Sequence, residues 1–401
     1  MLLKKCSALA CGLALGLAAT PVLADDDDAH LFGNWGGLRS SLEDKGISVE
    51  SILTIDGISN VKGGIKRNSV ALGNYDLTAA VDTEKAGLWS GGTFFAYFLA
   101  NFGREPSALI GDLQLTDNIE TYSTAKIYEL WYDHQLFDGA ASVLFGLHDL
   151  NSEFNALEYA GTLFHPSFGI QPDISQVGPS IFSTTALALR LRVQPSDHLY
   201  GLAAVYDGVP GDPENARGTR IKLSQDDGVF AITEWGFQAR EDARYYKAAV
   251  GYWHHSTDYE DFAETPRSDN QGVYGIGEYL LLSEAEDSDQ GLGVFAQLGF
   301  ADSNKNIIGH YIGAGFSYTG LIPNRDEDTL TFGMAKAYTS SGYRDAVTEA
   351  DRSETAFELS YRAPILPYFS VQPDVQYILN PSADPSIKDA VQVGVRLELA
   401  M

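Results

Sequence analysis

Two arginines, Arg190 and Arg192, stand two positions apart in a stretch where every second residue is apolar. In an extended strand both would point to the same side, and their guanidinium groups would form a ladder of donors for hydroxyl groups and anions. Ten further polar side chains occupy similar alternating positions, and we expect them to face the same interior: Glu129, Asp133, Glu234, Gln238, Arg240, Glu358, Arg362, Asp374, Gln376 and Arg396. The alternative is that they pair across strands and only stabilise a wall.

Two acidic pairs could be proposed as the carboxylates of a glycosidase. They are Glu153 with Glu158, and Asp258 with Glu260. No shaping motif surrounds either pair, and close acidic neighbours in an acidic chain are mostly solvated loop charge. We therefore predict no catalytic residue.

Metal-binding patterns are equally weak. His254 and His255 are adjacent, so in a strand they point to opposite faces and make poor joint ligands. The acidic runs at 25–28 and 284–289 lack the ligand spacing and the glycine of a dedicated calcium loop. We predict no metal site and no cofactor.

The elements that must position these side chains are strands, because the hydropathy pattern has a period of two. Residues 391–401 alternate without a break, with Arg396 and Glu398 on the polar side and valines and leucines on the other. The pattern recurs upstream at 74–82, 186–193, 234–240, 357–362 and 371–377. Such strands suit a wall with one apolar and one wet face, as in a transmembrane barrel.

The N-terminus indicates export. Lys4 and Lys5 precede a short apolar stretch and then small residues up to Ala24, which is typical of a cleavable signal peptide at 1–24. Both cysteines fall within it, so the remaining 401 − 24 = 377 residues contain no thiol. The net charge of −27 becomes −27 − 2 = −29 without the two lysines, which argues against nucleic acid as a partner.

We expect residues 25–401 to form one closed domain. We predict an acidic segment with a short helix at 25–46, where Leu38, Leu42 and a capping Gly46 fit a helix end, and an all-β antiparallel transmembrane barrel at 47–401. At roughly 20–25 residues per strand and connection, this length accommodates about 16 strands. Aromatic residues near predicted strand ends, such as those at 128–132 and 245–253, are expected to form interfacial girdles.

The chain resembles the carbohydrate-selective porin family, the OprB-like porins, almost from end to end. The resemblance lies in blocks that follow one another in the expected order, at 31–39, 45–47, 73–77, 82–89, 91–95, 128–132, 149–154, 190–197, 205–213, 290–295, 318–328 and 372–381. It implies a 16-stranded barrel in the bacterial outer membrane. Such a barrel admits monosaccharides such as glucose and other small polar solutes through a charged constriction, for which Arg190 and Arg192 are our preferred candidates.

The implied partners are the permeant sugars, the lipid of the outer membrane and the machinery that assembles barrels, with either a monomer or a homotrimer as the assembly. The chain departs from the family pattern at Met401, where such barrels usually end in an aromatic residue that the insertion machinery reads. Two alternatives stay open at this point. One is an ion-conducting porin without sugar preference, and the other is an exported soluble carbohydrate-active β-protein.

Overall fold

The computed structural model describes residues 29–241, 244–263, 268–284, 290–347 and 349–401. The signal peptide expected at 1–24 and the acidic residues 25–28 lie outside the described residues, as does most of the acidic run 284–289.

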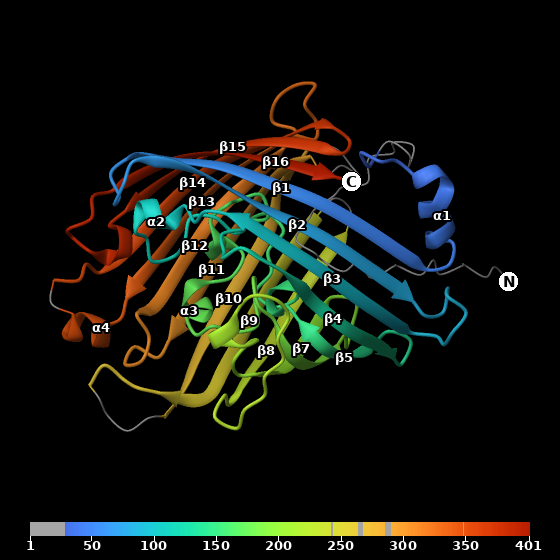
Figure 1. Cartoon of the computed structure of the whole chain (residues 1–401), viewed down its shortest axis with the longest axis horizontal. Helices are drawn as coiled ribbons and strands as arrows, with labels where there is room; N and C mark the ends of the chain where they lie inside the picture. The colour runs from blue at the N-terminus through green and yellow to red at the C-terminus, as the bar shows by residue number, and fades with distance from the viewer. Residues whose placement is uncertain (1–28, 242–243, 264–267, 285–289, 348) are drawn as a thin grey trace.

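The described chain forms one closed antiparallel barrel, in which each strand pairs with its neighbours in sequence and β1 pairs with β16 (Figure 1). This confirms the predicted all-β barrel of 16 strands. The strands are β1 (Ile47–Lys62), β2 (Asn68–Asp82), β3 (Gly92–Gly103), β4 (Thr124–Leu136), β5 (Ala141–His148), β6 (Ala186–Val193), β7 (Leu199–Asp207), β8 (Val229–Glu241), β9 (Arg244–Tyr259), β10 (Ser268–Ser283), β11 (Gly291–Ala301), β12 (Ile308–Thr319), β13 (Thr329–Thr339), β14 (Ser353–Leu366), β15 (Phe369–Leu379) and β16 (Ala390–Ala400).

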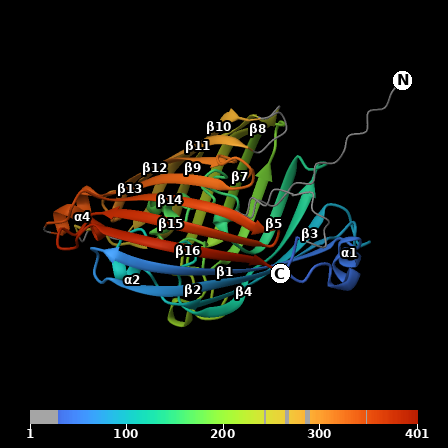
Figure 2. The same ribbon diagram turned by 90° about the horizontal axis from the view of Figure 1, so that it is seen from above.

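The two ends of the barrel differ. At one end, which we call the turn end, short connections such as 137–140, 194–198 and 367–368 join the strands, and α1 (Leu38–Glu43) lies beside the C-terminus. The opposite end, the loop end, carries α2 (Ser107–Ile110) and α4 (Ser341–Ala346), as the two views show (Figures 1 and 2).

The wall is apolar outside and polar inside, the reverse of a soluble protein. In β6, Leu189 and Leu191 are exposed on the outer face, while Arg190 between them is buried. The same alternation holds in β16, where Val395 and Leu397 are exposed and Arg396 is buried. An exposed apolar belt around a closed barrel suits contact with lipid, and it excludes the soluble β-protein considered above.

The predicted girdles are only partly correct. Tyr132 and Tyr252 do lie on the outer face, but Tyr128, Trp131 and Trp253 are buried against the interior. A β-bulge in β4, opposite Tyr97 and Phe98 of β3, contributes to this, because consecutive residues of β4 then turn inward. Clustering of aromatic residues in the sequence does not distinguish the two faces of a strand.

The short helix expected before the first strand is present. The 3-10 turn η1 (Trp35–Gly37) leads into α1, and Gly46 follows with a φ of 74°. A side chain at Gly46 would place its Cβ 2.5 Å from the Cβ of Lys85, so both the conformation and the space demand glycine. In the helix the buried side chain is Arg39, not one of the leucines.

Arg39 links this helix to the seam of the barrel, where the first strand, β1, pairs with the last, β16. Its guanidinium group donates hydrogen bonds to the carbonyl of Val49 at 2.9 Å and to that of Met401 at 3.1 Å, and it stacks on Trp35 at 4.4 Å. The backbone N–H of Met401 donates to the carbonyl of Ser51 at 2.8 Å. The C-terminal residue is thus held on the strand that closes the barrel although it is not aromatic.

Candidate functional site: the obstructed lumen

A long connection between β5 and β6 folds into the barrel. We call residues 149–185 the inward loop; it contains the 3-10 turns η2 (Leu150–Ser152) and η3 (Pro166–Phe168) and the short helix α3 (Pro172–Ser175). Its side chains at Phe154, Phe164 and Ile174 are fully buried, and α3 contacts β11 and β12 inside the ring of strands (Figure 1).

Three glutamates on the wall hold the backbone of the inward loop. Glu234 on β8 accepts the N–H of Asn155 at 2.9 Å, and Glu278 on β10 accepts the N–H of Tyr159 at 2.8 Å. Glu358 on β14 accepts the N–H groups of Phe164 and His165, the latter at 2.9 Å. A carboxylate that accepts backbone N–H groups forms a charge-assisted hydrogen bond, so each glutamate is a strong local tether.

Two of these glutamates, Glu234 and Glu278, also accept hydrogen bonds from tyrosines of the wall. Tyr200 and Tyr274 both donate to the carboxylate of Glu234, at 2.7 Å and 2.6 Å. Tyr245 donates to Glu278 at 3.0 Å. These phenols satisfy carboxylate oxygens that would otherwise be buried without a partner, which is costly. The wall therefore holds the carboxylates of Glu234 and Glu278 through its own tyrosines as well as through the loop.

A second connection, between β3 and β4, also turns inward. We call residues 104–123 the companion loop. Glu354 on β14 accepts the N–H of Leu113 at 2.7 Å, and Gln376 on β15 donates to the carbonyl of Thr116 at 2.8 Å. Asn118 donates to the carbonyl of Leu163, at 3.2 Å, so the two loops also touch each other. Together they narrow the lumen from the loop end.

Arg396 joins the wall to both loops. It binds Asp56 of β1 directly across the seam, with Nη2 2.7 Å from the carboxylate, and it donates to Asn118 of the companion loop at 2.7 Å. Its guanidinium group lies 4.1 Å from the ring centroid of Phe164 in the inward loop. Such a paired and stacked arginine is well suited to a buried position.

Arg190 and Arg192, our preferred constriction residues, occupy different environments. Arg190 is 4% exposed and binds Glu153 of the inward loop at 2.6 Å and Asp133 of β4 at 3.2 Å, and it donates to the hydroxyl of Ser142 at 2.6 Å. Arg192 lies on the same face nearer the turn end and is partly exposed. The two arginines do not form one row of free donors, because Asp133 and Glu153 bind the guanidinium group of Arg190.

The acidic pair Glu153 and Glu158 was expected to be solvated loop charge, and this holds for Glu158, whose side chain is 45% exposed, but not for Glu153, whose side chain is 20% exposed. Both residues lie on the inward loop, where Glu153 binds Arg190 and Glu158 binds Arg240 of β8 at 2.5 Å. The local sequence could not show this, because the arginines come from strands far along the chain. His254 and His255 do diverge as expected: His254 binds Asp269, while His255 binds Tyr259.

The twelve candidates therefore fall into two groups by exposure. One group is buried, and its members other than Asp374 bind residues of the wall or the loops: Glu129, Arg190, Glu234, Glu358, Asp374, Gln376 and Arg396. The other group keeps side chains at least partly exposed inside the barrel, toward the turn end: Asp133, Arg192, Gln238, Arg240 and Arg362. Residues that the sequence did not single out, Glu278 and Glu354 among them, belong to the first group.

Two buried acids of the loops stand apart from these tethers. Asp173 of α3 has no hydrogen-bond partner for either carboxyl oxygen among the described residues, and its burial raises its pKa to about 7. In the companion loop, burial likewise raises the pKa of Glu120 to about 7 although Ser107 donates to it. In contrast, burial lowers the pKa of His165 to about 3, so this ring is neutral at physiological pH.

No helix in the described ranges is both long enough and apolar enough to cross a membrane. Within the same ranges, no three histidine, cysteine, aspartate or glutamate side chains gather as a metal site would require.

A closed 16-stranded barrel with an apolar outer belt and a loop folded into its lumen defines a porin-type channel protein, not an enzyme. Residues 66–401 match the model of the carbohydrate-selective porin, OprB family, and the chain belongs to that family. It is therefore a protein of the bacterial outer membrane. The family resemblance noted from the sequence is confirmed.

Relatives of this chain include Porin B of Pseudomonas aeruginosa, which is 22% identical and aligns over 96% of this chain and 94% of that protein. Among solved structures, the high-pH structure of Pseudomonas putida OprB superposes with a TM-score of 0.85 at 18% identity, covering 94% of this chain and 99% of that one. The low-pH structure of the same protein gives a TM-score of 0.63 at 17% identity, covering 94% of this chain and all of the other. At these identities the superpositions establish the fold.

Proposed function

We propose that this chain is a passive diffusion channel for monosaccharides such as glucose and for other small polar solutes. The observation that carries the proposal is the set of three wall glutamates, Glu234, Glu278 and Glu358, which hold the inward loop across the lumen. A lumen narrowed by a fixed loop selects by size, whereas an open barrel of this strand number would pass larger solutes.

The solute path runs beside the two loops and leaves through the turn end. There it meets the partly exposed group of polar side chains: Asp133, Arg192, Gln238, Arg240 and Arg362. Mixed donors and acceptors let a sugar exchange its hydrogen bonds to water for hydrogen bonds to protein without being held tightly. We assign the charged part of the constriction to Arg192 of β6 and Arg240 of β8, whose side chains stay partly exposed inside the barrel although Glu158 pairs with Arg240, and not to the buried Arg190.

The orientation follows from the connections. Short turns at the end that carries α1 and the C-terminus suit the periplasmic side, and long loops at the other end suit the cell exterior. The outer belt contacts lipid, and the barrel is inserted by the outer-membrane assembly machinery. The arrangement of loops within one barrel supports a complete path in each copy, so transport does not depend on whether the protein is a monomer or a homotrimer.

Swelling of proteoliposomes in sugars of graded size tests this function. We expect rapid swelling in glucose and other monosaccharides, slower swelling in a disaccharide and none in a trisaccharide. Equal rates for all three sizes would contradict a loop-narrowed lumen. No swelling in any sugar, together with a measurable ion conductance, would replace the proposal with an ion-conducting porin that has no sugar preference.

A further inference from the structure

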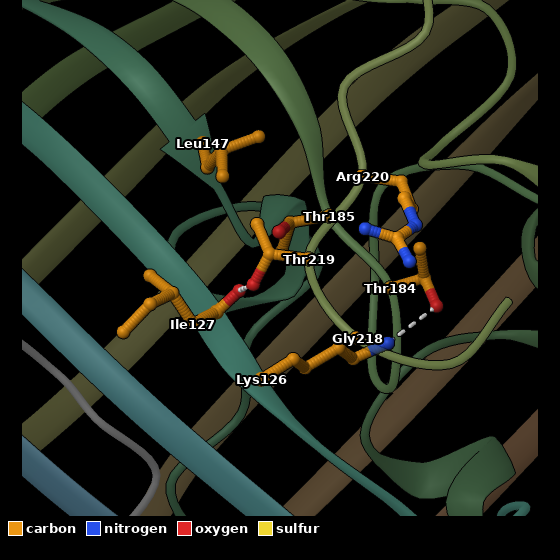
Figure 3. Close-up of a pocket in the computed structure, with 8 residues that line it drawn as sticks. All are labelled: Lys126, Ile127, Leu147, Thr184, Thr185, Gly218, Thr219 and Arg220. Atoms are coloured by element: carbon orange, nitrogen blue, oxygen red, sulfur yellow. Dashed lines mark hydrogen bonds between the residues drawn. The ribbon is translucent and has the colours of Figure 1, made fainter.

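Lys126 on β4 is a buried cation whose ammonium group contacts only neutral oxygens. It is 5% exposed, and its Nζ donates to the hydroxyl of Thr184 at 2.9 Å (Figure 3). It also donates to the hydroxyl of Tyr122 at 3.1 Å. No carboxylate lies within ion-pair distance of it among the described residues. Buried charges are normally paired because desolvation is costly, so an ammonium group that contacts only neutral oxygens creates a positive potential that favours a nearby anion.

A hollow lies next to this lysine, and Tyr122 connects the two. The phenol of Tyr122 accepts from Lys126, and its ring lines a hollow of about 480 Å³ at the loop end, close to α2. The lining includes three further cations, Lys66, Arg104 and Arg217, and one carboxylate, that of Glu105. Neutral donors and acceptors complete it: Asn68, Thr121 and Ser123.

The charge of this hollow contrasts with that of the whole protein. The chain has a net charge of −27, yet the charged side chains around the hollow are three cations and a single carboxylate. Lys66, Arg104 and Arg217 have no carboxylate within ion-pair distance in the described part of the chain, whereas Arg190, Arg240, Arg362 and Arg396 each have one. Arg220, from the same β7–β8 connection as Arg217, lies near Lys126 in the close-up (Figure 3).

The hollow lies on the lumen side of the wall and not on the side that faces lipid. Val70, one of its lining residues, packs against the interior cluster of Ile58, Leu72 and Phe164. The exposed apolar residues that face lipid lie on the opposite side of the same strands. A free solute, not the headgroup of a membrane lipid, is therefore the ligand that can reach it.

We propose that this hollow is an anion-binding site at the outer mouth for sugar acids, that is, monosaccharides that carry a carboxylate. The cations pair with the carboxylate, and the hydroxyl and amide groups of the lining accept and donate to the sugar hydroxyls. This inference rests on the proposed function in one respect, namely that solutes diffuse through the lumen beside the hollow. It extends the permeants of this channel from neutral to acidic monosaccharides, which the negative surface elsewhere repels.

Planar-bilayer recording with sodium gluconate as the probe tests the site. Gluconate added on the loop side in a constant chloride background should reduce the ion current at lower concentration than glucose does. Raising the ionic strength should weaken the block by gluconate and leave that by glucose unchanged, because salt screens only the charged ligand. Inorganic phosphate in a separate arm shows whether the site needs the sugar hydroxyls or only negative charge.

Two variants and a matched control make the test specific. The double variant Arg104→Gln and Arg217→Gln alters exposed loop residues, so it should fold normally, and we expect gluconate to block about tenfold less well, a loss that two nearby charges can produce. Lys126→Met removes the buried cation. The control, Lys45→Gln with Lys85→Gln, removes two positive charges at the turn end and should leave the block unchanged.

Several results would overturn the site. The first is equal block by gluconate and glucose in the wild-type channel. The second is a block by gluconate that the double variant leaves unchanged. The third is a block by phosphate as strong as that by gluconate, which would show that the sugar hydroxyl groups contribute nothing. Failure of the proposed function is separate, because it is read from the absence of swelling in neutral glucose. The double variant decides the question by itself, so the test does not depend on the insertion of Lys126→Met.

Discussion

Arg396 on β16 and Asp56 on β1 lie directly opposite each other across the seam that closes the barrel, with Nη2 of the arginine 2.7 Å from the carboxylate. The pair fixes the register of the first strand against the last. It also places the guanidinium group over Phe164 and beside Asn118, so closure of the wall and placement of both loops depend on one side chain.

Replacing Arg396 with Met should therefore destabilise the barrel. The change leaves the fully buried carboxylate of Asp56 without its partner, and breaking a buried pair in this way costs about 3–5 kcal/mol. The temperature at which the barrel unfolds in detergent electrophoresis should fall clearly. The double variant Arg396→Met with Asp56→Leu should recover much of the loss, and equal instability of both variants would contradict an ion-pair origin.

Replacing Glu358 with Ala should loosen the inward loop without unfolding the wall. The loop then loses the acceptor of the N–H groups of Phe164 and His165, so its middle can leave the lumen. Single-channel conductance should rise and swelling should extend to larger sugars. Glu84→Ala, in an exposed turn, serves as the control and should behave as wild type. An unchanged size limit in Glu358→Ala would show that the other tethers suffice.

Arg190 and Arg192 should respond differently to substitution. Arg190→Met leaves Glu153 and Asp133 without their common partner and should lower the free energy of unfolding by about 3 kcal/mol. Arg192→Gln should leave thermal stability unchanged and alter the relative rates for neutral and anionic solutes. Thermal unfolding and proteoliposome swelling on both variants separate the two roles, and the reverse assignment of effects would refute them.

The inward loop should be seated more firmly at pH 6 than at pH 8.5. The pKa of Asp173 is raised from 3.8 to about 7 by burial, so the stability contributed by its neutral form is complete below the ordinary pKa and is lost as the pH rises through 7. Between the ordinary and the raised pKa the loss is about 1.4 kcal/mol per pH unit, and above pH 7 it levels off. Current fluctuations should grow with pH.

The same prediction has internal controls. Asp173→Asn should remove most of the pH dependence, and Glu120→Gln should remove the part that comes from the companion loop, since the pKa of Glu120 also lies near 7. His165→Gln should not change it, because burial lowers the pKa of that histidine to about 3. Fluctuations that vary with pH equally in all three variants would assign the effect to other groups.

Arg39→Ala should weaken the closed seam at the turn end. The side chain donates to the carbonyls of Val49 and Met401, and its loss removes two hydrogen bonds to the strands that meet there. We expect a loss of about 1–3 kcal/mol, seen as a lower unfolding temperature and slower assembly. Lys45→Ala, just after the same helix, should have no effect. Normal assembly of Arg39→Ala would show that Met401 needs no such support.

Much of the architecture was readable from the sequence, because a transmembrane wall imposes a strict rule on each strand. The alternation at 391–401 and 186–193 predicted which residues face lipid, and Arg190, Arg396 and Glu358 do face the interior. Where a bulge interrupts the alternation in β4, the prediction failed, and Tyr128 turned inward beside Glu129.

The loops were not readable in the same way. Phe154, Phe164 and Ile174 of the inward loop are fully buried, but an apolar residue in a connection gives no period to follow, and its partners come from β8, β10 and β14. The sequence contained one usable signal, the unusual length of 149–185 with several large apolar residues. Loops of that length inside a compact domain are often functional.

The sequence by itself determined that this protein is an exported barrel with a wet interior, because alternating side chains repeat along every strand and depend only on near neighbours. Tertiary structure alone decided which interior charges are tethers and which stay open to solutes. That distinction arises from contacts such as Glu358 with His165 and Arg190 with Glu153, which join residues far apart in the chain once the wall has closed.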